Sequence, residues 1–135
     1  MERVALDTTF LIDLQNERRA RGQDRGALAF LKANRETELL LPCVALGEYL
    51  EGFDEPSSGE ARALVSRMRV IDVTPEVAVL YAETARHLRR RGQLIGSNDL
   101  WIGCSARVAG VPIVTRNADH FRRIPLLGVL AYSEA

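Results

Sequence analysis

The chain has 135 residues, of which 47% are hydrophobic and 27% are charged, a composition typical of a globular domain and not of a disordered segment. Its formal net charge is zero, which excludes a global positive field that would draw the whole protein to polyanions. At roughly 100 to 200 residues per domain, residues 1–135 are expected to form a single domain with a real core.

The cysteines and the hydropathy pattern exclude two further classes. Cys43 and Cys104 lie far apart and match no zinc-ligand spacing, so we expect buried thiols in a reducing compartment. No apolar run reaches the ~18 residues that span a bilayer, and no apolar signal region follows the N-terminus. The prediction is a cytoplasmic protein without a membrane partner.

Hydrophobic periodicity and turn residues predict short strands alternating with longer helices. The first third of the chain is predicted to hold a strand at 3–6, a short helix at 10–14, a polar helix end or loop at 15–25, a helix at 27–34 and a strand at 39–41. Next come a helix opened by Pro42 to about residue 53, a turn at 54–59, a helix at 60–69, a strand at 70–73 and a helix from Thr74-Pro75 to residue 91. The last elements are a helix capped by Ser97 or Asn98 and ended by Gly110, a strand at 112–115, a short segment capped by Asn117, and a strand at 128–132. This alternation predicts a parallel sheet with helices on both faces.

Four acidic residues follow the predicted strands or open the helices after them: Asp7, Glu48, Asp99 and Asp119. Each has a local explanation, because Asp7 can cap a helix and a carboxylate in a first helical turn is favoured by the helix dipole. Glu48 is harder to explain locally, since it interrupts an otherwise apolar helix. Local effects do not explain why all four fall at the edge where open α/β sheets bind ligands.

Clustered carboxylates repel one another by roughly 1 to 4 kcal/mol per pair at about 4 Å, so a cation is expected among them. Oxygen ligands without histidine or thiolate suit Mg²⁺ or Mn²⁺. The sequence has no Gly-rich phosphate loop and no GxSxG motif, which disfavours ATP-dependent transfer and serine hydrolysis. Hydrolysis of a phosphodiester by metal-activated water is therefore favoured. His120 is expected to be a surface capping residue or a substrate contact.

Four segments together resemble one family, the PIN-domain ribonucleases of the VapC toxin type. They are residues 6–13 (LDTTFLID), 46–52 (LGEYLEG), 95–102 (IGSNDLWI) and 113–121 (IVTRNADHF), in the family's order and spacing. The resemblance implies a three-layer α/β/α sandwich on a parallel sheet of about five strands. It also implies a Mg²⁺- or Mn²⁺-dependent endoribonuclease whose core ligands are Asp7, Glu48 and Asp99, with Asp119 completing that site or forming a second one.

The resemblance further implies a toxin that a cognate VapB-like antitoxin neutralises, in a heterocomplex, and a chain that forms homodimers. Polar residues at Thr8 or Thr9, Asn98, Thr115 and Asn117 match positions where a hydroxyl or amide orients the carboxylates and water. The expected reaction is in-line attack of water on an RNA phosphate, leaving a 5′-phosphate and a 3′-hydroxyl, with Asp99 or Asp119 as the proton acceptor.

Arginines flank two of the acids. Arg116 lies between the strand end and Asp119 and is the preferred candidate for binding RNA phosphate. Arg122 and Arg123 follow it, and Arg86, Arg89, Arg90 and Arg91 precede the loop to Asp99. Cations near a helix C-terminus also stabilise the helix dipole, which explains the second group equally well.

Two alternative functions, and one prediction about a partner surface, remain at this stage. A receiver or haloacid-dehalogenase-like phosphotransfer domain also places an Asp after its first strand, but it uses a late lysine, whereas the only lysine here is Lys32. A catalytically weak RNA- or antitoxin-binding module with the same fold is the second. Finally, an apolar partner surface is plausible on the helices at 43–53 and 60–68, although Leu46, Leu50 and Phe53 fit a core equally well.

Overall fold

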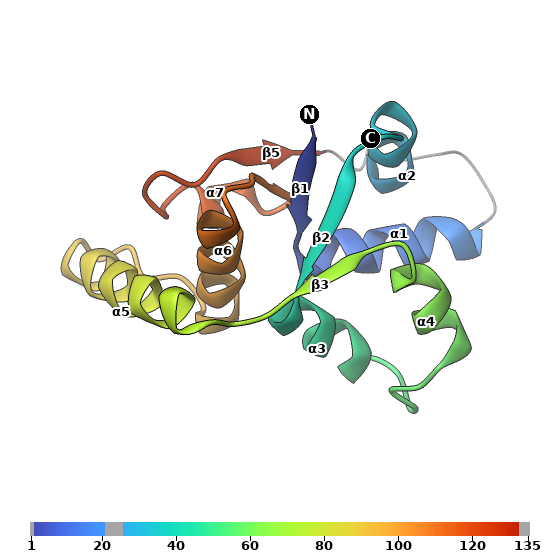
Figure 1. Ribbon diagram of the computed structural model, residues 1–135, viewed down its shortest axis with the longest axis horizontal. Helices are drawn as coiled ribbons and strands as arrows, with labels where there is room; N and C mark the ends of the chain where they lie inside the picture. Colours follow the sequence, from blue (N-terminus) through green and yellow to red (C-terminus); the bar gives the residue numbers. More distant parts are fainter. Residues whose placement is uncertain (1, 21–25, 133–135) are drawn as a thin grey trace.

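The computed structural model describes residues 2–20 and 26–132 (Figure 1). Its elements are β1 (Arg3–Leu6), α1 (Thr8–Ala20), α2 (Gly26–Ala33), β2 (Glu38–Pro42), α3 (Cys43–Glu51), α4 (Gly59–Val65), β3 (Arg69–Ile71), α5 (Pro75–Arg90), α6 (Ser97–Ala109), β4 (Ile113–Thr115), α7 (Ala118–Phe121) and β5 (Val129–Ala131). The predicted alternation of strands and helices is confirmed.

The strands form one five-stranded sheet in the order β3-β2-β1-β4-β5, and every pair is parallel. From β1 the chain builds outward through β2 to β3, and it then crosses back to place β4 on the other side of β1. The strand order therefore reverses between β1 and β4. In open α/β sheets, the carboxyl ends of the strands at such a reversal form the usual ligand-binding crevice.

Helices cover the sheet on both sides, which confirms the predicted α/β/α sandwich. In Figure 1, α5 and α6 lie to the left of the central strands, and α1, α2 and α4 lie to the right. Helix α3 packs against both α1 and α6, so it joins the two helical layers beside the strand ends. The residues of β1 after Arg3 are fully buried, and β4 is buried throughout, as expected of central parallel strands.

Two predicted helix boundaries are confirmed by their local chemistry. The Thr74 hydroxyl accepts a hydrogen bond from Val77 N at 3.3 Å and caps α5, with Pro75 in its first turn. Gly110 ends α6 with a φ of 73°, a left-handed conformation that glycine adopts without a steric penalty. Thr74 thus fixes where α5 begins, and Gly110 fixes where α6 ends and the chain turns toward β4.

Other boundaries were predicted wrongly, because tertiary contacts extend or shift the elements. Helix α1 begins at Thr8, before the predicted start at residue 10, and continues to Ala20, so the helix-end alternative is confirmed for residues 15–20. The Glu17 side chain is buried there and accepts hydrogen bonds from Ala27 N and Leu28 N, at the start of α2. The rest of the predicted polar segment, residues 21–25, lies outside the described residues. Pro42 ends β2 and precedes α3, and it does not stand in the first helical turn.

The remaining differences from the predicted boundaries involve only a few residues each. Gly96, and not Ser97 or Asn98, is the N-cap of α6, and the Asn98 side chain instead contacts Glu48. Helix α4 is shorter than predicted, and β3 begins one residue early and ends two residues early, at the exposed edge of the sheet. Cys43 and Cys104 are unpaired thiols. Among the described residues, no helix has the length and apolar character needed to cross a bilayer.

Candidate active site

Asp7 lies at the reversal of strand order and has a carboxylate that is almost completely enclosed. Its residue is 2% exposed. Oδ1 accepts hydrogen bonds from the Thr9 hydroxyl at 2.8 Å and from Phe10 N at 3.0 Å, and Oδ2 accepts one from the Thr115 hydroxyl at 2.5 Å. Thr115 is the last residue of β4, the strand next to β1. The Asp7 carboxylate is therefore fixed between two strands that are distant in sequence.

The hydrogen bond from Phe10 N shows that Asp7 also caps α1, as its local explanation predicts. The two roles do not compete, because a carboxylate has about four lone-pair sites for acceptor contacts. The cap fixes the position of Oδ1, and Thr115 fixes Oδ2. One backbone N–H and two hydroxyl groups therefore hold Asp7 in one orientation at the strand ends.

Glu48 reaches the same region from the second turn of α3. Its Oε1 accepts a hydrogen bond from the Thr8 hydroxyl at 2.6 Å, and its Oε2 accepts one from the Asn98 amide at 3.0 Å. Thr8 opens α1 and Asn98 opens α6. Glu48 thus bridges the two helical layers, which explains a charged residue on an otherwise apolar helix.

Asp99 completes the group from the first turn of α6. His120 Nδ1 lies 3.4 Å from Asp99 Oδ2 and 2.8 Å from the Asn117 amide nitrogen. Nδ1 donates to Asp99 when it carries a proton and accepts from Asn117 when it does not. The backbone nitrogen of Asn117 in turn donates to the Thr115 hydroxyl at 2.8 Å. A chain of contacts therefore links Asp99 to Asp7.

The electrostatics also join these acids. Burial raises the pKa of Asp7, the hydrogen bonds from Thr115, Thr9 and Phe10 N oppose that rise, and the nearby charge of Asp99 adds to it. Burial likewise raises the pKa of Asp99, the contact with His120 opposes the rise, and the charge of Glu48 adds to it. The charge of Asp99 thus acts on Asp7, and the charge of Glu48 acts on Asp99, so the three acids are coupled in one electrostatic site.

The structure separates Asp119 from this group. Its side chain is 92% exposed and pairs with Arg122 at 3.8 Å. The neighbouring His120, which the sequence marked only as a capping residue or substrate contact, is the residue of α7 that contacts Asp99. Asp119 keeps the place next to the site that its sequence position predicts, but its carboxylate faces solvent.

Two residues that sequence analysis did not single out lie beside Arg116. Asp13 is 3% exposed, and its Oδ2 accepts a hydrogen bond from the Tyr132 hydroxyl at 2.8 Å and lies 3.3 Å from Arg116 Nε. Burial and the contact with Asp13 raise the pKa of Tyr132, which keeps its hydroxyl a donor. Asp13 is the last residue of the segment 6–13, and the sequence alone did not show that its side chain is buried.

The three converging carboxylates match the donors of a hard divalent cation, although they do not form a closed ligand set. Among residues 2–20 and 26–132, no three His, Cys, Asp or Glu side chains are grouped closely enough to hold a metal ion by themselves. Mg²⁺ keeps several of its waters and is usually bound through one or two carboxylates. The unbalanced charge among Asp7, Glu48 and Asp99 therefore fits a partly hydrated cation.

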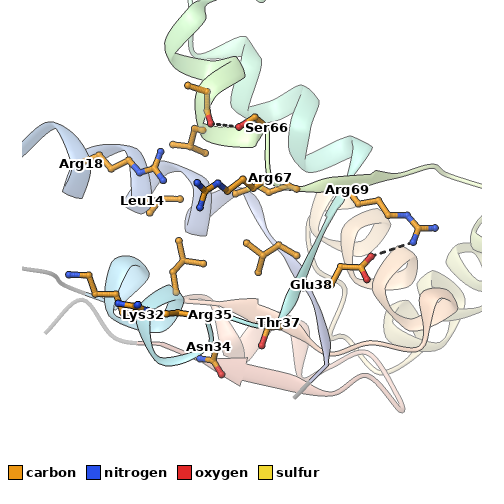
Figure 2. Close-up of a pocket in the computed structure, with 15 residues that line it drawn as sticks. Leu14, Arg18, Lys32, Asn34, Arg35, Thr37, Glu38, Ser66, Arg67 and Arg69 are labelled. Carbon is orange, nitrogen blue, oxygen red and sulfur yellow. Dashed lines mark hydrogen bonds and ion pairs between the residues drawn. The ribbon is translucent and has the colours of Figure 1, made fainter.

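A separate hollow lies beside the first residues of β2 and β3. Its volume is about 780 Å³ and none of the four acids lines it. Figure 2 shows that α1, α2 and α4 contribute side chains to it. The lining combines apolar side chains with five basic ones, Arg18, Lys32, Arg35, Arg67 and Arg69.

Comparisons with known proteins agree with this geometry. The model of the family described as PIN domain matches residues 4–127. "Ribonuclease VapC1" of Methanocaldococcus jannaschii is 24% identical over 133 residues, covering 98% of this chain and 88% of that protein. "Ribonuclease VapC2" of Rickettsia felis is 33% identical over 73 residues, which span 54% of either chain.

Solved structures share the fold. VapBC2 from Rickettsia felis bound to a DNA fragment from its promoter matches with a TM-score of 0.83, at 22% identity, over 97% of this chain and 99% of that one. DNA-bound VapBC from Salmonella typhimurium matches with a TM-score of 0.73, at 22% identity, over 97% and 98% of the two chains. The family match runs from β1 through β4 and includes all four acids. The chain belongs to the PIN-domain family.

Proposed function

We propose that this protein is a divalent-metal-dependent endoribonuclease of the VapC type. The observation that carries the proposal is the convergence of Asp7, Glu48 and Asp99 at one edge of the sheet, with hydroxyl, amide or imidazole groups beside each carboxylate. Relatives named ribonuclease VapC and family membership support RNA as the substrate. The alternative is a weakly catalytic module that binds RNA or an antitoxin.

Asp7, Glu48 and Asp99 would hold Mg²⁺ or Mn²⁺, and Asp119 would complete the site or a second one from its solvent-facing position. A divalent cation bound there supplies Lewis-acid stabilisation of the charge on the phosphate. The chain's own residues position the carboxylates: Thr115 orients Asp7, and Thr8 and Asn98 orient Glu48.

The reaction proposed is in-line attack of water on the RNA phosphorus. Asp99 or Asp119 accepts a proton from the attacking water, the bond from phosphorus to the 3′ oxygen breaks, and the departing 3′ oxygen takes a proton from solvent. The products carry a 5′-phosphate and a 3′-hydroxyl. His120 and Asn117 keep Asp99 in place, since Nδ1 of His120 lies between the two side chains.

Cleavage of a fluorogenic single-stranded RNA with Mg²⁺, Mn²⁺ or EDTA tests the proposal. We expect Asp7→Asn and Asp99→Asn to lower the rate by about 100-fold or more, because a metal contributes several kcal/mol to such reactions. Asp119→Asn should have a smaller effect, since its side chain is 92% exposed. Asp54→Asn, in an exposed loop, is the matched control.

Two results would contradict the proposal. The first is metal-independent cleavage that survives purification of the Asp99→Asn protein. The second is metal binding without turnover across varied RNAs, which would favour the binding-module alternative.

A VapB-like antitoxin is the proposed protein partner. The structural neighbours are described as VapBC assemblies. The hollow beside β2 and β3 is the surface we assign to it, because its lining combines the partly exposed apolar side chains of Leu31, Leu39 and Met68 with basic ones. An amphipathic segment with acidic residues fits this combination. Of the apolar surface predicted on the helices at 43–53 and 60–68, only the second helix contributes residues to this hollow. The homodimer stays a prediction.

A further inference from the structure

A buried carboxylate beside the proposed active site has no part in the mechanism given above. Asp13 lies on α1, and it is 3% exposed. An ionised carboxylate is costly to bury unless charge and hydrogen bonds compensate it. Here the Tyr132 hydroxyl and the guanidinium of Arg116 provide that compensation, at 2.8 and 3.3 Å from the same oxygen, Oδ2.

This group is continuous with the carboxylate site. Tyr132 also interacts with Thr9, the residue whose hydroxyl donates to Asp7, and it senses the charge of Asp7. Arg116 stands in sequence between Thr115 and Asn117, whose side chains contact Asp7 and His120. Asp13 thus places a cation at the border of an otherwise acidic site.

A purely structural ion pair is the simpler explanation. A buried pair is often no more stabilising than apolar residues of the same volume, so stability alone is a weak reason for burying Asp13 here. The Arg116 side chain also remains 42% exposed, while its partner is enclosed. In the Arg69–Glu38 pair, which has the same 3.3 Å separation, the two side chains are 68% and 45% exposed, so neither fixes the other.

We propose that Asp13, together with Tyr132, is a positioning residue that holds the Arg116 guanidinium to contact an RNA phosphate next to the carboxylates. An RNA phosphate that enters the site is repelled by the three carboxylates. A planar guanidinium can bind such a phosphate with two hydrogen bonds. A contact from Arg116 offsets that repulsion on the protein side. This inference rests on the proposed function, because it concerns the RNA of that same site.

The test measures RNA binding and not turnover. A fluorescein-labelled single-stranded RNA is titrated with full-length Asp99→Asn protein and followed by fluorescence anisotropy over a series of salt concentrations. Adding Arg116→Gln should raise the Kd by about 10-fold and lower the slope of log K against log salt by about 0.7, as expected for one lost phosphate contact on a single strand.

Asp13→Asn keeps an acceptor for Tyr132 but removes the charge that holds Arg116. It should raise the Kd less than Arg116→Gln does. The double variant Asp13→Asn/Arg116→Gln should match Arg116→Gln alone, because a positioning residue has no effect once the group it positions is gone. Arg116→Lys, which keeps the charge without the planar guanidinium, should restore the salt slope but only part of the affinity.

Arg19→Gln is the matched control, since it removes one arginine charge and breaks an exposed ion pair with Glu60, which includes none of the proposed site residues. It should leave both Kd and slope close to the parent values. Thermal unfolding of each variant separates the two explanations. A lower Tm in Arg116→Gln with unchanged Kd and slope would overturn the inference, as would additive effects in the double variant.

Failure of the proposed function gives a different signature. If the unmodified chain cleaves no RNA with Mg²⁺ or Mn²⁺, the enzymatic proposal fails, yet the Kd and slope still decide the role of Arg116. If the chain binds no RNA, the Arg116 inference fails as well. With an active enzyme, Arg116→Gln should act mainly on KM, whereas loss of a carboxylate acts on kcat.

Discussion

The two ends of the sheet use charge in opposite ways. At the carboxyl ends, Asp7 is 2% exposed and short side chains fix both of its oxygens. Beside the amino ends of β2 and β3, long basic side chains surround a hollow with apolar walls (Figure 2). The carboxyl end holds a few acidic atoms in fixed positions, and the other end presents a broad basic surface.

Under the proposed function, this difference follows from what each end would bind. A small cation and one phosphate require oxygens placed to within a fraction of an ångström, which buried hydrogen bonds provide. A protein segment requires apolar area and complementary charge, and long side chains can adapt to it. We therefore expect substitutions at the carboxyl end to change the reaction, and substitutions at the hollow to change association.

Among the substitutions that test this difference, Thr115→Val is expected to have the largest effect, a loss of RNA cleavage. The change removes the hydrogen bond to Asp7 Oδ2 with little change in shape, so the carboxylate loses its fixed orientation. We expect RNA cleavage to fall by about 10- to 100-fold. Steady-state cleavage assays compare it with Thr115→Ser, which keeps the hydroxyl and should retain most activity. Equal activity of the two variants would contradict the role given to this contact.

A smaller effect is expected at the hollow. Arg35→Glu combined with Arg67→Glu reverses two charges on its lining, which should weaken association with the cognate antitoxin by about 10-fold and make it less sensitive to salt. Surface plasmon resonance measures both quantities. Arg89→Glu with Arg90→Glu, on α5, makes the same charge change outside the hollow. If this control weakened binding equally, the hollow would not be the antitoxin surface.

The smallest effect concerns stability. The pKa of Asp7 is raised in the folded protein, so its carboxyl contributes most favourably below the unfolded value of 3.8, and that contribution is lost as pH rises through the folded pKa. Asp7→Asn cannot ionise. The Tm of Asp7→Asn minus the Tm of the parent should therefore be a few degrees larger at pH 7 than at pH 4, both measured in EDTA. Scanning calorimetry at both pH values checks this, and a pH-independent difference would contradict it.

Much of the fold was predictable because its signals are local. Alternating apolar runs, the Thr74-Pro75 helix start and the glycine that ends α6 depend only on neighbouring residues, and the structure agrees with them. The end of α1 was not predictable from local pattern, since Glu17 is buried only because α2 offers it two backbone donors.

The candidate site divides in the same way. The sequence determined which acids exist, their order and their positions after strands, and parallel pairing then brings Asp7, Glu48 and Asp99 to one edge. Only the tertiary structure decided that His120 contacts Asp99 while Asp119 faces solvent, and that Asp13 is buried against Tyr132 and Arg116. The physical reason is that strand order and helix rotation, which no local pattern encodes, determine which of two neighbouring side chains points into the site.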